Sequence, residues 1–285
     1  MIPSELLDEW QAGLTDGSIV PYLGPGALAD VRSTADGRPM PATGEQLILA
    51  MNNGQPMAPK LMYEFPRAAM NIELKRGRSA VTRFLDATYA SRQWTRAALH
   101  DWLAEIAPPY VIDINRDTQL QDSFAHLPHL LVLGCARIGG TDWRFKLYAH
   151  DGDSYTLITP EQANPGLPVL FKPMGSPLPQ PSYIASDADY VDYITELMGG
   201  FAVPPFLKPR RLGKRYLLLG MRLDRDSERM VLSDLIYGAA TGPTGWALIA
   251  GPTDKERRFC ARMGIEIIPA EVGDLLQEWS AELVA

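Results

Sequence analysis

Short apolar segments that alternate with helical segments are the feature that most limits the fold of this chain. They lie at 169–172, 215–220, 246–249 and 265–268, and helical patterns follow the last three. Apolar runs of this length are typical of strands that are buried on both faces of a parallel sheet. Because strands that alternate with helices form such sheets, the pattern predicts a doubly wound α/β fold.

The N-terminal half supplies further strands of the same predicted sheet. Residues 19–23 form an apolar run that enters a glycine turn at 24–26, and residues 110–114 and 130–133 form two more. A strand, a glycine turn and a helix in this order are typical of nucleotide-binding α/β domains. A ligand is therefore expected near the carboxyl end of the first strand.

Helical signals lie on both sides of the first strand. Ser4 is the expected N-cap of a helix that ends at Gly17, and Thr43 with Gln46 forms a capping box for the next helix. Later apolar residues recur at spacings of three and four, which predicts a helical insertion over 55–106. Because this insertion interrupts the sheet, we expect it to cover the ligand cleft as a lid or a small subdomain.

A second insertion reads as an antiparallel hairpin. Alternating residues flank Asp151 and Gly152, and glycine favours the tight turn that such a hairpin needs. The pattern predicts a small β-hairpin insertion over 141–160. We therefore expect residues 1–285 to form a single doubly wound domain, with a mainly parallel sheet that carries both insertions.

Composition excludes several classes of function. The chain has 34 Asp and Glu against 27 Lys and Arg, without a basic run that could follow a phosphate backbone, so no nucleic-acid partner is expected. It shows neither a secretory signal nor an apolar stretch of membrane-spanning length, so we expect a cytoplasmic protein with no membrane contact. Cys135 and Cys260 lack metal-site spacing and are expected to be reduced core residues, without a metal.

Four short motifs follow the predicted strands. They lie at 24–26 (Gly-Pro-Gly), 113–117 (Asp-Ile-Asn-Arg-Asp), 172–176 (Lys-Pro-Met-Gly-Ser) and 219–226 (Leu-Gly-Met-Arg-Leu-Asp-Arg-Asp). Ligands of doubly wound sheets bind outside the carboxyl ends of strands, so these motifs are expected to converge on one cleft. Glycine at the first turn would let backbone approach a phosphate, although a structural turn without a ligand is the alternative.

The order of these motifs, over about residues 17–280, resembles that of Sir2-like domains. The family pattern is close to Gly-Ala-Gly-x-Ser, Thr-Asn-Tyr-Asp, His-Gly-Ser and Gly-aromatic-Ser-Leu-x-Asp. The segment 182–190 is also similar to one found in the Sir2-like NAD hydrolases of bacterial defence systems. The resemblance implies a Rossmann-like domain that binds NAD or ADP-ribose, in which an asparagine and a histidine cleave the glycosidic bond.

The resemblance assigns most positions of that site to residues of this chain. Asn115 matches the catalytic asparagine, and Met174 stands at the position of the family's histidine. The ligand-binding positions that it implies are Gly24, Gly26, Asn115, Arg116, Asp117, Gly175, Gly220, Arg222 and Asp226.

Several of these positions depart from the family pattern. The thioether of Met174 can neither accept nor donate a proton at neutral pH, which excludes general-base catalysis there. Leu28 replaces the serine of the glycine turn, and Pro25 removes one backbone N–H. Arg116 and Arg222 bring two cations to the cleft, where they either pair with nearby aspartates or bind an anionic ligand.

Two classes of function compete on this basis. The favoured class is a catalytically degenerate Sir2-like protein, a pseudoenzyme that binds a nucleotide or another anionic small molecule, or that holds a protein partner. The alternative is an active NAD glycohydrolase, with the missing base sought at His126; the cysteines of zinc-dependent deacetylases are absent. A generic α/β enzyme unrelated to Sir2 would be favoured if Asn115, Gly175 and Gly220 were far apart.

Overall fold

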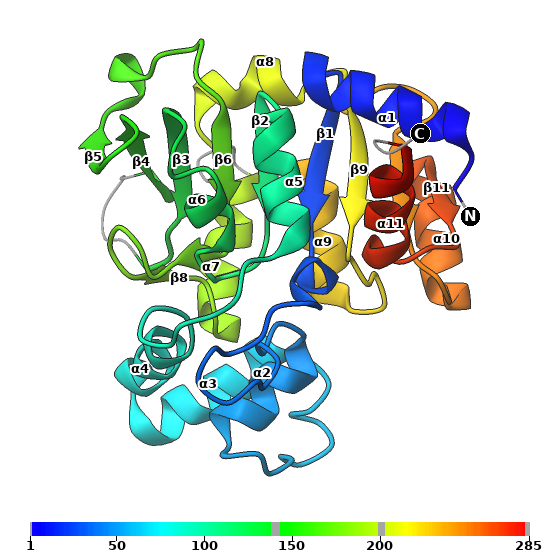
Figure 1. The fold of residues 1–285 in the computed structure, drawn as a ribbon. Helices are drawn as coiled ribbons and strands as arrows, with labels where there is room; N and C mark the ends of the chain where they lie inside the picture. Colours follow the sequence, from blue (N-terminus) through cyan, green and yellow to red (C-terminus); the bar gives the residue numbers. More distant parts are fainter. Residues whose placement is uncertain (1, 138–142, 199–202, 283–285) are drawn as a thin grey trace.

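A nine-stranded, mostly parallel sheet forms the centre of the protein and confirms the expected α/β fold (Figure 1). The computed structural model describes residues 2–137, 143–198 and 203–282. In sheet order the strands are β11 (Ile265–Ile268), β10 (Gly245–Leu248), β9 (Arg215–Leu219), β1 (Ile19–Leu23), β2 (Tyr110–Asp113), β6 (Val169–Lys172), β3 (His129–Gly134), β4 (Phe145–His150) and β5 (Tyr155–Ile158).

The order in which the strands are added to the sheet reverses between β1 and β9. After β1 it continues on the side of β2, and it returns later on the other side with β9, β10 and β11. β1 pairs in parallel with both neighbours, with Leu23 opposite Asp113 on one side and Leu219 on the other. The carboxyl ends of β1, β2 and β9 therefore lie together at the switch point, where doubly wound folds bind ligands.

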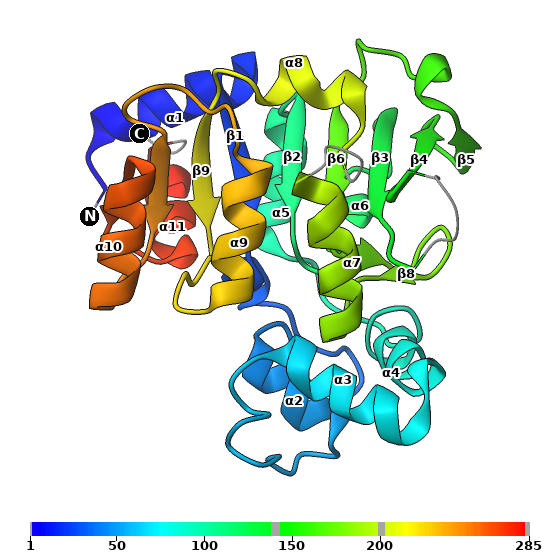
Figure 2. The ribbon, with the colours of Figure 1, turned by 180° about the vertical axis from the view of Figure 1, so that it is seen from behind.

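Helices cover both faces of the sheet, because each inner strand buries apolar side chains on both sides (Figures 1 and 2). On β1, Ile19 and Leu23 face one core, and Val20 and Tyr22 face the other. One layer contains α1 (Ser4–Asp16), α5 (Ala98–Ile106), α6 (Gln119–Ser123) and α11 (Val272–Glu282). The opposite layer contains α7 (Asp187–Met198), α9 (Asp226–Leu235) and α10 (Asp254–Met263).

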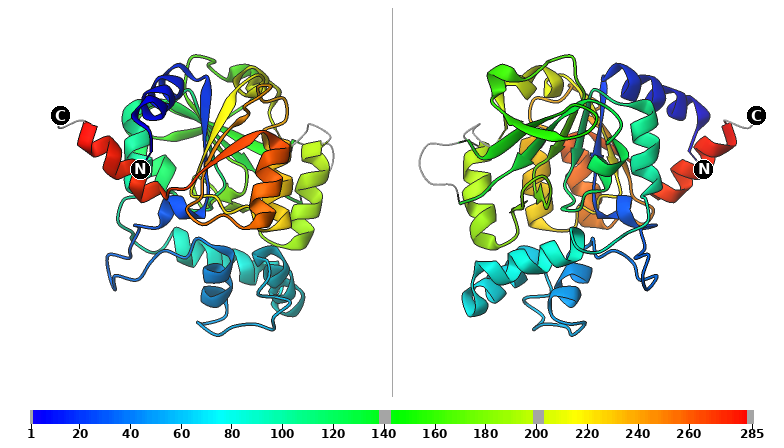
Figure 3. Two further views of the ribbon diagram at one scale, coloured as in Figure 1. Left: turned by 90° about the vertical axis from the view of Figure 1, so that its right-hand side faces the viewer. Right: turned by 60° about the vertical axis from the view of Figure 1, so that its left-hand side comes forward.

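A third, smaller core lies within a helical subdomain below the strand ends in Figure 1. It contains α2 (Gly44–Met51), α3 (Phe65–Arg76) and α4 (Arg78–Tyr89), and Figure 3 shows it set apart from the sheet. These boundaries differ from the expected insertion over 55–106. The helix α2 belongs to the subdomain, whereas α5 packs Leu99 and Leu103 against the sheet.

The expected hairpin is present as β4 and β5, which pair antiparallel and extend the main sheet at its edge. Residues 141 and 142 of the expected 141–160 insertion lie outside the described residues. A second, two-stranded sheet contains β7 (Gly175–Ser176) and β8 (Ser182–Tyr183). The shorter elements are α8 (Lys208–Arg211) and the single 3₁₀ turns η1 (Pro25–Leu28), η2 (Pro160–Gln162) and η3 (Pro205–Leu207).

The predicted helix caps at Thr43 and Gly17 are confirmed, whereas the one at Ser4 is not. Thr43 and Gln46 form the predicted capping box of α2, and Gly17 ends α1 in the left-handed conformation with φ 73°. The prediction for Ser4 was wrong: Ser4 is the first residue of α1 and Pro3 is the N-cap, without a side-chain hydrogen bond. No helix in the described ranges has the length and apolar character needed to cross a bilayer.

Candidate functional site

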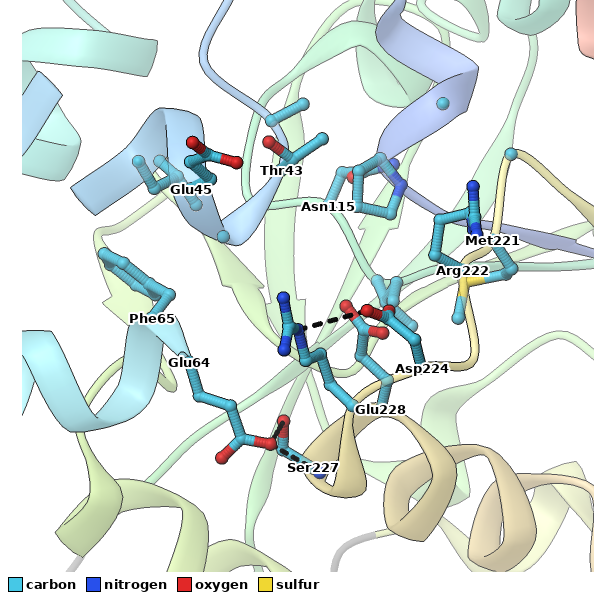
Figure 4. A pocket seen from close by; sticks show the side chains of 18 of the residues that line it. Thr43, Glu45, Glu64, Phe65, Asn115, Met221, Arg222, Asp224, Ser227 and Glu228 are labelled. Carbon is cyan, nitrogen blue, oxygen red and sulfur yellow. Dashed lines mark hydrogen bonds and ion pairs between the residues drawn. The ribbon is translucent and has the colours of Figure 1, made fainter. Parts of the chain in front are cut away.

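A cavity of about 480 Å³ lies between the carboxyl ends of the strands and the helical subdomain. Its walls combine the ends of five strands with three segments of the subdomain (Figure 4). The strand ends contribute Pro25 and Gly26 after β1, Ile114, Asn115 and Arg116 after β2, Met174 after β6, Gly220, Met221 and Arg222 after β9, and Leu248 and Ile249 at the end of β10. The subdomain contributes residues 42–45, 47, 62–66 and 89.

The glycines at the switch point hold two loops against each other. The amide of Gly24 donates to the carbonyl of Leu219 at 2.9 Å, and that of Gly26 donates to the carbonyl of Gly220 at 2.8 Å. Gly220 has φ +71°, and a Cβ there would lie 2.3 Å from the amide nitrogen of Ala27. Close packing of backbone therefore explains why glycine is needed at these positions.

The backbone N–H groups that a phosphate would need at this glycine turn already donate hydrogen bonds within the protein. The Ala27 amide donates to the Gly24 carbonyl at 3.0 Å, and Pro25 has no amide hydrogen. Together with the bonds of Gly24 and Gly26, every N–H group from residue 24 to residue 27 is engaged within the protein. The turn therefore lacks the free donors of a phosphate-binding loop.

Asn115 is held rigidly at the cavity wall. Its Nδ2 donates to the carbonyl of Gly24 and to Oδ1 of Asp113, each at 2.9 Å. The backbone amide of Asn115 donates to the same carboxylate oxygen at 2.9 Å. Because both amide hydrogens are used, the side-chain oxygen of Asn115 is the atom that can accept a hydrogen bond from a ligand.

A buried ion pair supports Asn115 from behind. Nζ of Lys172 lies 2.5 Å from Oδ2 of Asp113, and neither side chain is exposed to solvent. His100 on α5 lies next to the same carboxylate, with its Nε2 3.8 Å from Oδ2. Burial alone would raise the pKa of Asp113, but the charge of Lys172 and the contact with His100 outweigh it and hold that pKa well below its ordinary value.

Met174 lines the cavity with only 2% of its surface exposed. No histidine is found among the described residues of the cavity wall. His126 is exposed and precedes β3, so it lies toward the amino end of that strand, at the edge of the sheet opposite Asn115. The alternative placement of a general base at His126 therefore has no support in the geometry.

Both arginines of the motifs have partners within the protein. Arg116 donates through Nε and Nη2 to the carbonyl of Ile184 at 2.9 and 2.6 Å. Arg222 forms a two-pronged pair with Glu256, at 2.9 and 3.1 Å. Neither pairs with the aspartates weighed from the sequence. The Arg116 side chain is buried, whereas the Arg222 side chain is about half exposed and its charge is matched by that of Glu256.

The structure brings part of the predicted site together. Gly26, Asn115, Met174, Gly220 and Arg222 line the cavity, as does Arg116, and Gly24 lies directly behind the wall. Three predicted positions are not on the wall and have other roles. Asp117 accepts a hydrogen bond from the Gln119 amide at the start of α6. Gly175 in β7 packs against Ser182 in β8, and Asp226 pairs with Arg229 and Lys255.

Glu228 is the main residue of the wall that the sequence motifs did not identify. It lies in the first turn of α9, and its Oε2 is buried without a hydrogen-bond partner among the described residues. Burial, reinforced by the charge of Asp224, raises the pKa of Glu228 to about 8. Its position three and four residues before the buried Val231 and Leu232 could have revealed its inward orientation.

Glu64 connects the helical subdomain to α9 across the cavity. Its Oε1 accepts the amide of Asp226 at 3.1 Å, and the amide and hydroxyl of Ser227 at 3.3 Å each. A carboxylate at a helix N-terminus is stabilised by the free amides and the helix dipole. No local sequence signal could have found this contact, because Glu64 and Ser227 lie 163 residues apart.

These features define the class of the protein as a doubly wound α/β protein with a ligand cavity at the switch point of its sheet. In comparisons with known proteins, no family model matches the chain and no curated protein matches its sequence. Within the described part of the chain, no group of three or more His, Cys, Asp or Glu side chains is placed to hold a metal ion.

Proposed function

We propose that the protein is a catalytically degenerate Sir2-like binding protein, whose cavity holds the nicotinamide riboside part of an NAD-type ligand. One observation carries this proposal. Gly26, Asn115, Met174, Gly220 and Arg222 come from four separate strand ends, and all five line a single cavity. Each stands at a position that the family resemblance assigns to the ligand site. Of the three residues that distinguish the generic α/β alternative, Asn115 and Gly220 line the same cavity, whereas Gly175 does not.

A nucleoside suits the chemistry of the wall. The volume of about 480 Å³ lies within the usual range of small-molecule pockets. The fixed side-chain oxygen of Asn115 can accept a hydrogen bond from a ribose hydroxyl. Phe65 and Tyr89 add aromatic surface on the subdomain side, against which a planar ring can pack.

A diphosphate does not fit the glycine turn as it stands. The amides of residues 24 to 27 are all engaged, and Arg116 and Arg222 are held by Ile184 and Glu256. Binding a phosphate there would break existing hydrogen bonds and separate an ion pair. We therefore expect ADP-ribose to bind more weakly than the nucleoside, and NAD to gain little from its diphosphate.

Efficient cleavage of the glycosidic bond is not expected. General acid–base catalysis typically supplies about 10²- to 10⁴-fold, and Met174 cannot take part in proton transfer. In this proposal the occupied cavity is a signal that is read by movement of the helical subdomain or by a protein partner. Such movement of the subdomain as a lid stays a prediction.

Active NAD glycohydrolase is the second candidate, and Glu228 is the observation that favours it. Its pKa of about 8 lies near neutral pH, where a carboxyl group can exchange a proton with a substrate. If the protein cleaves NAD, Glu228 rather than His126 is the group to test first, because Glu228 lines the cavity.

Calorimetric titration tests the proposed binding. Nicotinamide riboside, NAD and ADP-ribose are titrated into the wild type, Asn115→Ala and Asn164→Ala, the last being a matched change outside the cavity. We expect binding of nicotinamide riboside to weaken about tenfold in Asn115→Ala, as loss of a buried hydrogen bond predicts, and to be unchanged in Asn164→Ala. Absence of binding by all three ligands, or equal affinity in Asn115→Ala, would overturn the proposal.

A further inference from the structure

Acidic side chains outnumber basic ones on the cavity wall. The described wall contains three arginines, Arg116, Arg222 and Arg225. It contains five acidic side chains, Glu45, Glu64, Asp224, Glu228 and Glu271. A cavity of this composition attracts cations and repels anions.

The three arginines do not reverse this balance. Arg222 is matched by Glu256, which lies outside the wall and adds a negative charge. Nε of Arg225 lies 3.3 Å from Oδ2 of Asp224, and this pair is dashed in Figure 4. Only Arg116 lacks a carboxylate partner, and its guanidinium is directed to the carbonyl of Ile184 and lies 5.3 Å from the centre of the Phe65 ring.

Asp224 and Glu228 both line the cavity (Figure 4), and the charge of Asp224 acts on the carboxyl group of Glu228. One oxygen of Glu228, Oε2, is buried without a partner among the described residues. Burial makes an ionised Glu228 carboxylate costly, and the charge of Arg225 offsets this cost only in part. A cation placed between the two carboxyl groups would supply the missing partner.

We propose that Asp224 and Glu228 make the cavity selective for a ligand that carries a positive charge, such as an N-alkylated pyridinium ring, over a neutral ligand of the same shape. This inference rests on the proposed function, since it assumes that a ligand occupies the cavity. The inference specifies the charge of the ligand, about which the family motifs say nothing.

The charged surroundings of Glu228 support this selectivity. Asp224 from the preceding loop, Glu64 from the subdomain and Glu256 from α10 are acidic and disfavour its ionisation, and Arg225 alone opposes them. These groups raise the pKa of Glu228 to about 8, together with burial as the largest cause. At pH 7 the group is mostly protonated, and at pH 9 it is mostly ionised. A bound cation would favour the ionised form and would therefore release a proton at pH 7.

A matched pair of ligands isolates the charge. Nicotinamide riboside is a cation, whereas 1,4-dihydronicotinamide riboside has nearly the same shape and is neutral. We expect the wild type to prefer the cation, and the preference to increase up to about tenfold between pH 7 and pH 9, because the ionised fraction of a group with a pKa of about 8 increases by that factor. Titration calorimetry at both pH values measures this ratio.

Two variants identify the residue responsible. Glu228→Gln keeps the shape and cannot ionise, so its preference for the cation should not change with pH. Asp226→Asn removes a carboxylate from the same turn of α9 that does not line the cavity, and it should behave as the wild type. A cooperative unfolding transition in each variant shows that the protein is folded.

The outcomes separate the two proposals. Binding that depends on Asn115 but is equal for the two nucleosides, or a pH effect that persists in Glu228→Gln, would overturn the charge selectivity and leave the nucleoside site standing. Absence of binding by both nucleosides at both pH values would overturn the proposed function itself.

Discussion

The two walls of the cavity are built in different ways. On the sheet side, Asp113 and Lys172 are fully buried, and Asn115 is fixed by three hydrogen bonds of 2.9 Å. On the subdomain side, Thr43 and Glu45 are exposed. The sheet wall is thus complete without a ligand, whereas the subdomain wall offers side chains that can still rearrange around one.

Few polar contacts attach the subdomain to the rest of the protein near the cavity. Glu64 reaches the start of α9, Arg78 pairs with Asp189, and the hydroxyl of Tyr183 donates to Asp86 at 2.7 Å. The contact of Glu64 is partly exposed to solvent and contributes little by itself, whereas the Arg78 pair uses the fully buried carboxylate of Asp189. We therefore expect substitutions in the sheet wall to change stability strongly, and substitutions in the subdomain wall to change mainly its local opening.

The largest effect is expected for Lys172→Met, which leaves Asp113 as a buried charge without its partner. Breaking such a pair costs about 3–5 kcal/mol. The folded-state pKa of Asp113 is depressed, so its contribution to stability is present above its ordinary pKa and is lost as the pH falls through the folded-state value. Denaturant unfolding of Lys172→Met at pH 7 measures the loss. Combining Lys172→Met with Asp113→Asn should recover part of it, and a loss below about 1 kcal/mol would show that the pair does not support the wall.

The next effect is expected for Gly220→Ala at the contact between the β1 and β9 loops. The added Cβ would lie 2.3 Å from the amide nitrogen of Ala27, at a backbone φ of +71°. Strain and overpacking together should cost about 3 kcal/mol. Gly213→Ala is the control, because Gly213 has φ +67° and nothing lies within 4 Å of the added atom. Equal destabilisation of the two variants in thermal unfolding would mean that the loop contact contributes nothing.

A smaller effect, of opposite sign, is expected for Glu228→Gln. The raised folded-state pKa means that the unfolded chain loses its proton first, so this residue destabilises the fold increasingly as the pH rises from its ordinary value of 4.5 to about 8. Allowing for partial solvent access, Glu228→Gln should stabilise the protein by about 1–2 kcal/mol at pH 8.5 and by nothing at pH 4. Denaturant unfolding at both pH values checks this, and a stabilisation that is independent of pH would contradict it.

The smallest effect on global stability is expected for Glu64→Gln, which weakens the contact between the subdomain and α9. The change should cost below about 1 kcal/mol, because an exposed charge contact contributes little. Tryptic cleavage after Lys75 or Arg76, at the junction of α3 and α4, should nevertheless become several-fold faster. Glu45→Gln serves as a matched control, since no hydrogen bond or ion pair is described for its carboxylate. Unchanged cleavage in Glu64→Gln would show that other contacts hold the subdomain.

Much of the sheet could be predicted from the sequence, because buried parallel strands leave an unambiguous apolar run. The bounds of β1, β6 and β11 agree with the predicted 19–23, 169–172 and 265–268. The limits of the helical insertion could not be predicted in the same way. The spacing of apolar residues in α5 reveals one buried face, but it does not tell whether that face meets the sheet or the subdomain.

The candidate site was predictable only where its residues directly follow strands. Asn115, Met174 and Gly220 do so, and the topology of the sheet brings them together. Glu228 and Glu64 reach the cavity through the packing of α9 and the docking of the subdomain, which no local pattern encodes. The pairing of Arg222 with Glu256, 34 residues later, is equally non-local, and it removes the anion site that the sequence suggested.

The central claim, binding without turnover, is tested most directly by measuring nicotinamide release from NAD by the wild type, Asn115→Ala and Met174→His under identical conditions. We predict release at the buffer background by the wild type and by Asn115→Ala. We predict a measurable rate in Met174→His, because the substitution places a proton-transfer group on the same cavity wall as Asn115. Substantial release by the wild type that is abolished in Asn115→Ala would contradict the account and would identify the protein as an active glycohydrolase.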